Sequence, residues 1–263
     1  MSGPRLPVAL LPLLAAVQFL TRLPVSLPEE LPDGRDHASL LAASTVWFPV
    51  VGGLVGMLAA AVLVAAAWVW PPLLAAALVL AAETLLTGAF HDDAWADTCD
   101  AIGGGWTREQ VLTILKDSRL GTYGVAGLTL GLGLRAAALA ELIGRDVAAA
   151  AAVLVAAHAG SRLAILGLMR TMEPIRDRHT QARDVAGQLS GTRVVGASLL
   201  ALPWLLPAAV SQPGRMAAAA GVTTAVLWLY RRKIIARVGG STGDFLGGGA
   251  FLTHTLVLVV AAA

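Results

Sequence analysis

Charge is scarce in this sequence. Only 14% of the residues are charged, whereas 57% are hydrophobic and the mean hydropathy is +0.73, which lies well outside the range of ordinary soluble domains. No run of basic residues is longer than Arg231-Arg232-Lys233, and this argues against nucleic-acid binding. The composition therefore indicates a protein whose main solvent is lipid.

Cysteine is nearly absent, since Cys99 is the single one in the chain. One thiol cannot form an internal disulfide, and the sequence has no CxxC pair or His/Cys cluster of the kind that binds zinc. Nor does a low-complexity linker divide the 263 residues. We therefore expect one integral membrane domain over residues 1–263.

Long uncharged runs are abundant and predict the fold. The run 45–70 is long enough to cross about 30 Å of hydrocarbon, and it carries tryptophans near its ends, as membrane spans do. Further apolar stretches follow at 73–90, 121–143, 147–169, 194–212, 215–230 and 245–263. They predict an all-α, polytopic transmembrane helical bundle with about seven spans. Residues 6–20 are too short for a clear span and predict an interfacial or re-entrant helix.

Basic residues are distributed unevenly between the connections. Four polar stretches that fall on one side of this arrangement hold fourteen of them, and the opposite connections hold only Arg145 and Arg215. Because basic loops stay in the cytoplasm, we expect a multi-pass protein of the cell (inner) membrane with its active-site loops facing the cytoplasm. The four stretches are 21–44, 91–120, 170–193 and 231–244.

The densest polar feature is the run His91-Asp92-Asp93-Ala94-Trp95-Ala96-Asp97-Thr98-Cys99-Asp100. If this run is helical, Asp93, Asp97 and Asp100 are spaced i, i+4, i+7 and lie on one face. Three carboxylates on one stripe repel one another unless a cation neutralises them, and oxygen ligands of this kind suit Mg²⁺. The alternative is a solvated acidic helix start that the helix dipole favours.

Two more polar motifs precede later spans. The first is Lys116-Asp117-Ser118-Arg119-Leu120-Gly121-Thr122-Tyr123-Gly124, whose cations can bind phosphate oxygens and whose Asp117 can complete a metal site. For Lys116 and Arg119 the alternative is ordinary cytoplasmic flanking charge. The second is the glycine-rich segment 239–249, where Asp244 enters the membrane interface and the glycines permit close backbone approach.

Four ionisable side chains fall inside the predicted spans, namely Glu83, Arg135, His158 and Arg162. Such groups are expensive in lipid, so we expect them to face the bundle interior or a polar cavity. Each of them could also serve only to pair helices with one another.

The three motifs together resemble the cobalamin synthase family, the adenosylcobinamide-GDP ribazoletransferases. The runs 91–100, 116–124 and 239–248 match the family's motifs in order and spacing, and the stretches 19–25 and 47–52 resemble its opening. The resemblance covers most of the chain, and 170–193 matches only loosely. Ala94 and Ala101 stand where the family has glycines, and Asp92 where it has an apolar residue. The carboxylates stay in place, and the resemblance does not fix the backbone path of this loop.

The resemblance implies an Mg²⁺-dependent transferase of the last steps of cobalamin biosynthesis, which joins adenosylcobinamide-GDP to α-ribazole or its 5′-phosphate and releases GMP. The implied partners are these two substrates and the lipid bilayer, and no nucleic acid is expected. Whether the protein forms a homo-oligomer stays open. On this reading Asp93, Asp97, Asp100 and Asp117 are metal ligands, and Asp100 or Asp117 accepts the hydroxyl proton. The expected substrate-binding residues are His91, Lys116, Ser118, Arg119, Thr242 and Asp244.

Two other classes also place aspartates in membrane helices. A CDP-alcohol phosphotransferase has a D-G-x-x-A-R core, but this chain has Ala94 after Asp93 and lacks the arginine, with Asp97 in that neighbourhood. An ion or metal transporter would place its carboxylates near the midplane of broken helices, whereas the aspartates here follow the ends of apolar runs.

Overall fold

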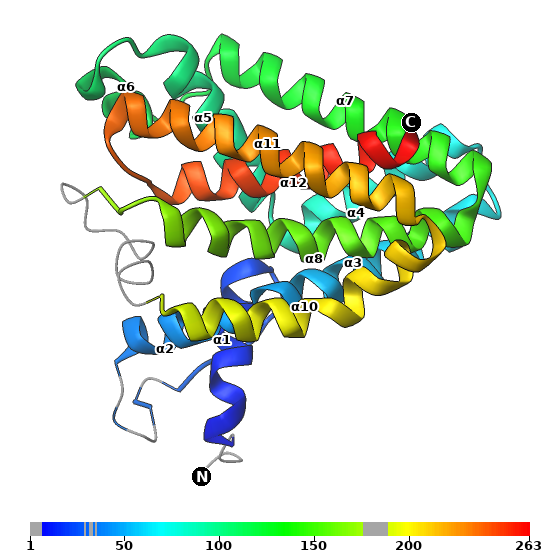
Figure 1. Ribbon diagram of the computed structural model, residues 1–263, viewed down its shortest axis with the longest axis horizontal. Coiled ribbons are helices and arrows are strands. Elements are labelled where there is room, and N and C mark those ends of the chain that lie inside the picture. The colour runs from blue at the N-terminus through cyan, green and yellow to red at the C-terminus, as the bar shows by residue number, and fades with distance from the viewer. Residues whose placement is uncertain (1–6, 29, 32–33, 35, 176–188) are drawn as a thin grey trace.

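The computed structural model in Figure 1 describes the chain apart from residues 1–6, 29, 32–33, 35 and 176–188. Part of the predicted cytoplasmic stretch 170–193 therefore lies outside the described residues. Two short 3₁₀ turns, Val8–Leu10 and Thr45–Trp47, precede α1 and α3. The α-helices are α1 (Leu11–Leu20), α2 (His37–Ser44), α3 (Phe48–Ala67), α4 (Pro72–Thr87), α5 (Phe90–Gly104), α6 (Arg108–Ile114), α7 (Thr122–Arg145), α8 (Val147–Thr171), α10 (Gly191–Ser211), α11 (Pro213–Val238) and α12 (Gly243–Ala262).

Several of these helices begin and end where the sequence dictates. Proline occupies the first turn of α3, α4 and α11, where its missing N–H and fixed φ suit a helix start. Gly88 and Gly239 end α4 and α11 in the left-handed conformation that favours glycine. Thr107 begins α6 with a capping box that Gln110 completes.

The described helices confirm the all-α membrane bundle. Five segments are long and apolar enough to span a membrane, namely 37–67, α7, α8, α10 and α12. A sixth results if α4 and α5 count as one broken span, and the apolar helix Val8–Leu20 is too short to be one. About seven spans were predicted from the sequence because the run 215–230 was taken as a span. In the structure this run belongs to the 26-residue α11, whose second half is basic.

The ends of the bundle differ in character. In Figure 1 the short links α3–α4, α7–α8 and α10–α11 gather at one end together with the C-terminus, and α5, α6 and the start of α12 lie toward the other end. This alternation of short and long connections is the pattern from which the orientation in the membrane was predicted. The described parts of the long polar connections therefore lie toward one end of the molecule.

The corner between α4 and α5 is sharp and unusual. The two helices meet at 93°, and two consecutive residues, Gly88 and Ala89, have φ values of 66° and 58°. Glycine adopts this conformation freely, but for alanine the left-handed region costs about 1 kcal/mol. A Cβ on Gly88 would also collide with the Arg22 side chain. The corner turns α5 across the bundle, so that His91 is buried while Asp93 is exposed.

The centre of the bundle is formed by α8 and α12, which are the most buried of the candidate spans. They pack against each other, and α8 also packs against α3, where Gly52 and Gly56 lie so close to α8 that a Cβ would meet its backbone. The ionisable residues of the spans point inward as predicted, because Glu83, Arg135, His158 and Arg162 are all at most 6% exposed.

Candidate active site

The aspartate run is helical, as the sequence predicted. Helix α5 continues from Phe90 to Gly104, so Asp93, Asp97 and Asp100 share one face. Asp93 is exposed, Asp97 is half-buried and Asp100 is buried. The charges of Asp93, Asp100 and Asp244 all repel that of Asp97, so Asp244 from the start of α12 has joined the stripe. Four carboxylates therefore gather at this end of the bundle.

Helix α12 reaches α5 through specific contacts. The hydroxyl of Thr98 in α5 donates to the carbonyl oxygen of Asp244 at 3.2 Å. From α11, the hydroxyl of Tyr230 donates to the carbonyl oxygen of Phe245 at 2.7 Å and holds the same end of α12. A Cβ on Gly247 would lie 2.6 Å from the Cβ of Ala94, so only glycine permits this approach. The glycine-rich third motif is thus the surface on which α5 packs.

Thr242 prepares the start of α12. Its hydroxyl accepts a hydrogen bond from the backbone N–H of Phe245 at 3.4 Å, which caps the helix, and it lies 3.3 Å from Asp244 Oδ2. Thr242 is buried and Asp244 is half-buried. Both were predicted to bind substrate, and of the two it is Asp244 that joins the carboxylate cluster.

Asp100 has a role that the sequence analysis missed. Its two oxygens accept hydrogen bonds from the backbone N–H groups of Gly121 and Gly124, each at 2.8 Å. A Cβ on either glycine would overlap the carboxylate. Asp100 therefore caps the N-terminus of α7 from another helix and joins the first motif to the second. The signal in the sequence was the pair of glycines at a helix start without a capping side chain of its own.

The second motif forms the link between α6 and α7. Lys116, Ser118 and Arg119 are exposed there. Arg119 donates to Asp117 through Nη2 at 2.6 Å and through Nε at 2.9 Å. These hydrogen bonds lower the pKa of Asp117 to about 2, so its carboxylate stays ionised at physiological pH. The link ends at Gly121, whose backbone N–H donates to Asp100. This hydrogen bond places Lys116 and Arg119 near the carboxylate end of the bundle.

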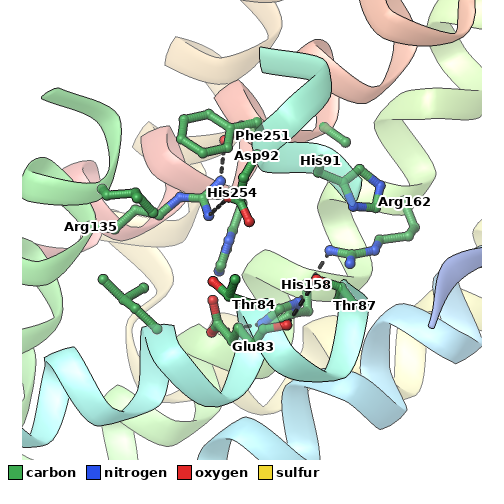
Figure 2. Close-up of a pocket in the computed structure, with 13 residues that line it drawn as sticks. Glu83, Thr84, Thr87, His91, Asp92, Arg135, His158, Arg162, Phe251 and His254 are labelled. Atoms are coloured by element: carbon green, nitrogen blue, oxygen red, sulfur yellow. Dashed lines mark hydrogen bonds and ion pairs between the residues drawn. The ribbon is translucent and has the colours of Figure 1, made fainter. Parts of the chain in front are cut away.

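His91 does not join the carboxylates. It is buried, packs edge-on against the Phe90 ring, and lines an interior cavity together with side chains from α4, α8 and α12 (Figure 2). Its Nε2 has no hydrogen-bond partner among the residues that the structure describes. Its predicted role in substrate binding stays a prediction.

The fold and this site together define a class of protein. It is a polytopic membrane protein that assembles acidic, cationic and glycine-rich motifs from α5, the α6–α7 link and α12 at one end of its bundle. Such an arrangement is typical of membrane enzymes that act on phosphate-containing substrates, because carboxylates can hold a divalent cation and the cations can bind phosphate oxygens.

Comparison with known proteins identifies the family. Residues 12–262 match the family described as cobalamin-5-phosphate synthase. Relatives named adenosylcobinamide-GDP ribazoletransferase include one from Leptothrix cholodnii, 41% identical over 88% of this chain and 87% of its own length. Those from Bradyrhizobium diazoefficiens and Vibrio cholerae are 37% and 35% identical, each over 94% of this chain and over 92% and 91% of their own lengths. No solved structure matches the chain.

The chain therefore belongs to the cobalamin-5-phosphate synthase family and is an enzyme of cobalamin synthesis. The resemblance noted from the three motifs is confirmed, and the match extends over nearly the whole length of the chain.

Proposed function

We propose that this protein joins adenosylcobinamide-GDP to α-ribazole, or to its 5′-phosphate, and releases GMP. The observation that carries the proposal is the convergence of three distant motifs. Asp100 of α5 binds the start of α7, and Thr98 of α5 binds the start of α12. The relatives that bear the name of this activity cover the same motifs, since they align with about nine-tenths of the chain.

The chemistry explains why the site needs both signs of charge. A ribose hydroxyl oxygen forms a bond to the corrinoid-side phosphorus, the bond from that phosphorus to the bridging oxygen breaks, and GMP leaves with the electron pair. Negative charge develops on phosphoryl oxygens and must be neutralised. Lys116 and Arg119 would bind those oxygens, and Ser118 would donate a hydrogen bond to the substrate, whereas the Thr242 hydroxyl donates to Asp244 Oδ2 at 3.3 Å.

Mg²⁺ fits the carboxylate cluster, because all of its donors are the hard oxygens that this ion prefers. It would supply positive charge against the pyrophosphate. Asp93 and Asp97 would hold it, and Asp244, whose charge acts on Asp97, would be a third candidate ligand. Asp100 and Asp117 were predicted as ligands too, and each already uses its oxygens in hydrogen bonds to Gly121 and Gly124 or to Arg119.

The hydroxyl proton needs an acceptor, and two aspartates were predicted for this role. Asp117 is a poor base, because its pKa of about 2 reflects a charged form that Arg119 stabilises. Asp100 belongs to the aspartate stripe and also contacts the end of the cationic link. Its two hydrogen bonds fix its orientation, and two lone-pair positions on its oxygens remain. We therefore assign proton acceptance to Asp100 and the positioning of Arg119 to Asp117.

A direct assay tests the activity. Detergent-purified protein supplied with adenosylcobinamide-GDP and α-ribazole is expected to release GMP and form a cobalamin product, and EDTA is expected to stop the reaction until Mg²⁺ is restored. The same preparation should release no CMP from a CDP-alcohol and should move no ions across liposomes. CMP release without GMP release would assign the chain to the phosphotransferase alternative.

A substitution of Arg119 tests whether this residue binds phosphate or only contributes flanking positive charge that sets the membrane orientation. Arg119→Lys keeps the charge but loses the planar fork that now holds Asp117 through two nitrogens, so we expect about a tenfold or greater drop in kcat/KM for the corrinoid-GDP. Steady-state kinetics measure the change. Arg170→Lys, at the exposed end of α8, is the matched control and should behave like the wild type. Wild-type kinetics in Arg119→Lys would leave Arg119 as flanking charge only.

We also propose that the carboxylate end faces the cytoplasm of a cell (inner) membrane, because basic residues cluster at that end. In a Cys99→Ala background, Lys233→Cys should resist an impermeant thiol reagent on intact cells and react after permeabilisation. Arg145→Cys at the opposite end should react on intact cells. Labelling of position 233 on intact cells would show that the orientation is the opposite of the proposed one. Arg178, in the same predicted cytoplasmic stretch as Arg170, lies outside the described residues.

A further inference from the structure

A second polar cluster lies inside the bundle, away from the carboxylate end. Glu83 of α4, His158 of α8 and His254 of α12 are only 6%, 2% and 3% exposed. Their ligand-type atoms all lie within 4.8 Å of one another, and Figure 2 shows the three side chains converging from different helices. Burying a carboxylate and two imidazoles among membrane helices is costly unless they bind one another or a ligand.

The internal contacts satisfy two members of this cluster and leave the third open. Glu83 Oε1 lies 2.9 Å from His158 Nε2, which makes a close pair. The rings of His158 and His254 are 4.4 Å apart between centroids. His254 Nε2 has no hydrogen-bond partner within the described part of the chain, although it is fully enclosed. A buried imidazole nitrogen without a protein partner is a place where a water molecule or an ion can bind.

The cavity beside the cluster is small and polar. The free space in it, about 20 Å³, suits one water-sized oxygen ligand and is too small for a phosphate group. Besides His254, it is lined by His91 and Arg162, each of which has an unpaired buried nitrogen: His91 Nε2 and Arg162 Nε. Three unpaired nitrogens therefore border one cavity.

The charged side chains that line the cavity are balanced before a ligand binds. Arg135 is held elsewhere, because it donates to Thr255 and to the Phe251 carbonyl at 2.9 Å and lies 3.6 Å from Asp92. Arg162 Nη1 donates to Ser161 Oγ at 2.9 Å. The carboxylates of Glu83 and Asp92 balance the two arginines if the histidines are neutral.

We propose that Glu83, His158 and His254 bind a transition-metal ion of the Zn²⁺ class, with an oxygen ligand in the remaining position. Two imidazoles and one carboxylate are a ligand set that zinc uses with an open fourth position, whereas Mg²⁺ prefers oxygen donors throughout. This site is distinct from the proposed Mg²⁺ site in residues and in chemistry, and it does not rest on the transferase proposal.

One such occupant accounts for all three unpaired atoms. The metal would take His254 Nε2, and a water or hydroxide as its oxygen ligand would accept from Arg162 Nε–H and donate its O–H to His91 Nε2. Arg162 Nη1 now lies 3.2 Å from His158 Nδ1. Metal on Nε2 leaves the proton of His158 on Nδ1, so Arg162 would turn away from this nitrogen and keep its hydrogen bond to Ser161. A hydroxide as the oxygen ligand would also reduce the added positive charge.

Metal titration of the full-length protein in detergent tests the site. After removal of bound metal by EDTA, we expect Co²⁺ to bind at about one ion per chain with the intense visible bands of a four-coordinate nitrogen and oxygen site, and Zn²⁺ to displace it. Excess Mg²⁺ should leave the bands unchanged. His254→Ala and Glu83→Gln should abolish them, while His37→Ala at the exposed start of α2 and Asp93→Asn at the carboxylate end should retain them.

The wild-type spectrum alone decides the proposal if the cluster variants do not purify as monodisperse protein. Absence of stoichiometric Co²⁺ binding by the wild type would mean that a water molecule fills the cavity, and it would overturn the proposal. Bands that persist in folded His254→Ala would overturn it as well. Neither result depends on GMP release, so failure of this site and failure of the proposed transferase activity are distinguishable.

Discussion

Asp93→Asn and Asp97→Asn are each expected to reduce turnover by about 100-fold or more, while the protein still inserts and purifies. Asp97 shares one end of the bundle with Asp93, Asp100 and Asp244, whose charges repel its own, and a bound cation would neutralise this repulsion. An amide in place of either carboxylate weakens cation binding and removes charge stabilisation from the transition state. Single-turnover and steady-state rates over a range of Mg²⁺ concentrations measure the effect.

Glu109→Gln provides the matched control for both variants. Glu109 is an exposed carboxylate in α6, in the same long connection as the aspartate stripe, and it has no part in the proposed metal site. Its amide variant should keep wild-type turnover and the wild-type Mg²⁺ dependence. If Asp93→Asn and Asp97→Asn both turn over substrate at near-normal rates at limiting Mg²⁺, the carboxylate end does not bind a catalytic metal.

Local sequence patterns predicted the parts of this molecule that depend on neighbouring residues. The spacing of Asp93, Asp97 and Asp100 defines a helical stripe, and α5 confirms it. Apolar runs predicted each long helix, because a helix in lipid satisfies its own backbone and needs about 20 apolar residues. The span count was less predictable, since a break such as that at Gly88 and Ala89 depends on backbone conformation rather than on hydropathy.

Contacts between distant segments could not be predicted from these patterns. Asp244 reaches the stripe because Gly247 permits α12 to approach α5, and the two motifs are separated by more than 100 residues in the sequence. The cost of charge in lipid correctly predicted that Glu83 and His158 point inward. It could not predict that His254 meets them, since the three residues come from three helices and form no sequence motif.

Asp100 carries the second large expected effect, because two roles meet in this side chain. Asp100→Asn retains one oxygen that can accept a backbone hydrogen bond, but it has no carboxylate to take up the hydroxyl proton. We therefore expect the folded Asn variant to lose about 100-fold or more in kcat, the usual contribution of a positioned general base. Asp100→Ala should additionally lower the thermal midpoint, because the buried N–H groups of Gly121 and Gly124 lose their acceptor.

Comparison of the two variants separates the roles of Asp100. Thermal unfolding followed by size-exclusion fluorescence gives the stability, and GMP release per folded molecule gives the turnover. A base that also caps α7 predicts that kcat collapses in both variants while the thermal midpoint falls much further in the alanine variant. If Asp100 only caps α7, the Asp100→Asn variant should instead keep a turnover per folded molecule close to that of the wild type. That result would move proton acceptance to another carboxylate of the cluster and leave Asp100 as the residue that holds the cationic link against α5.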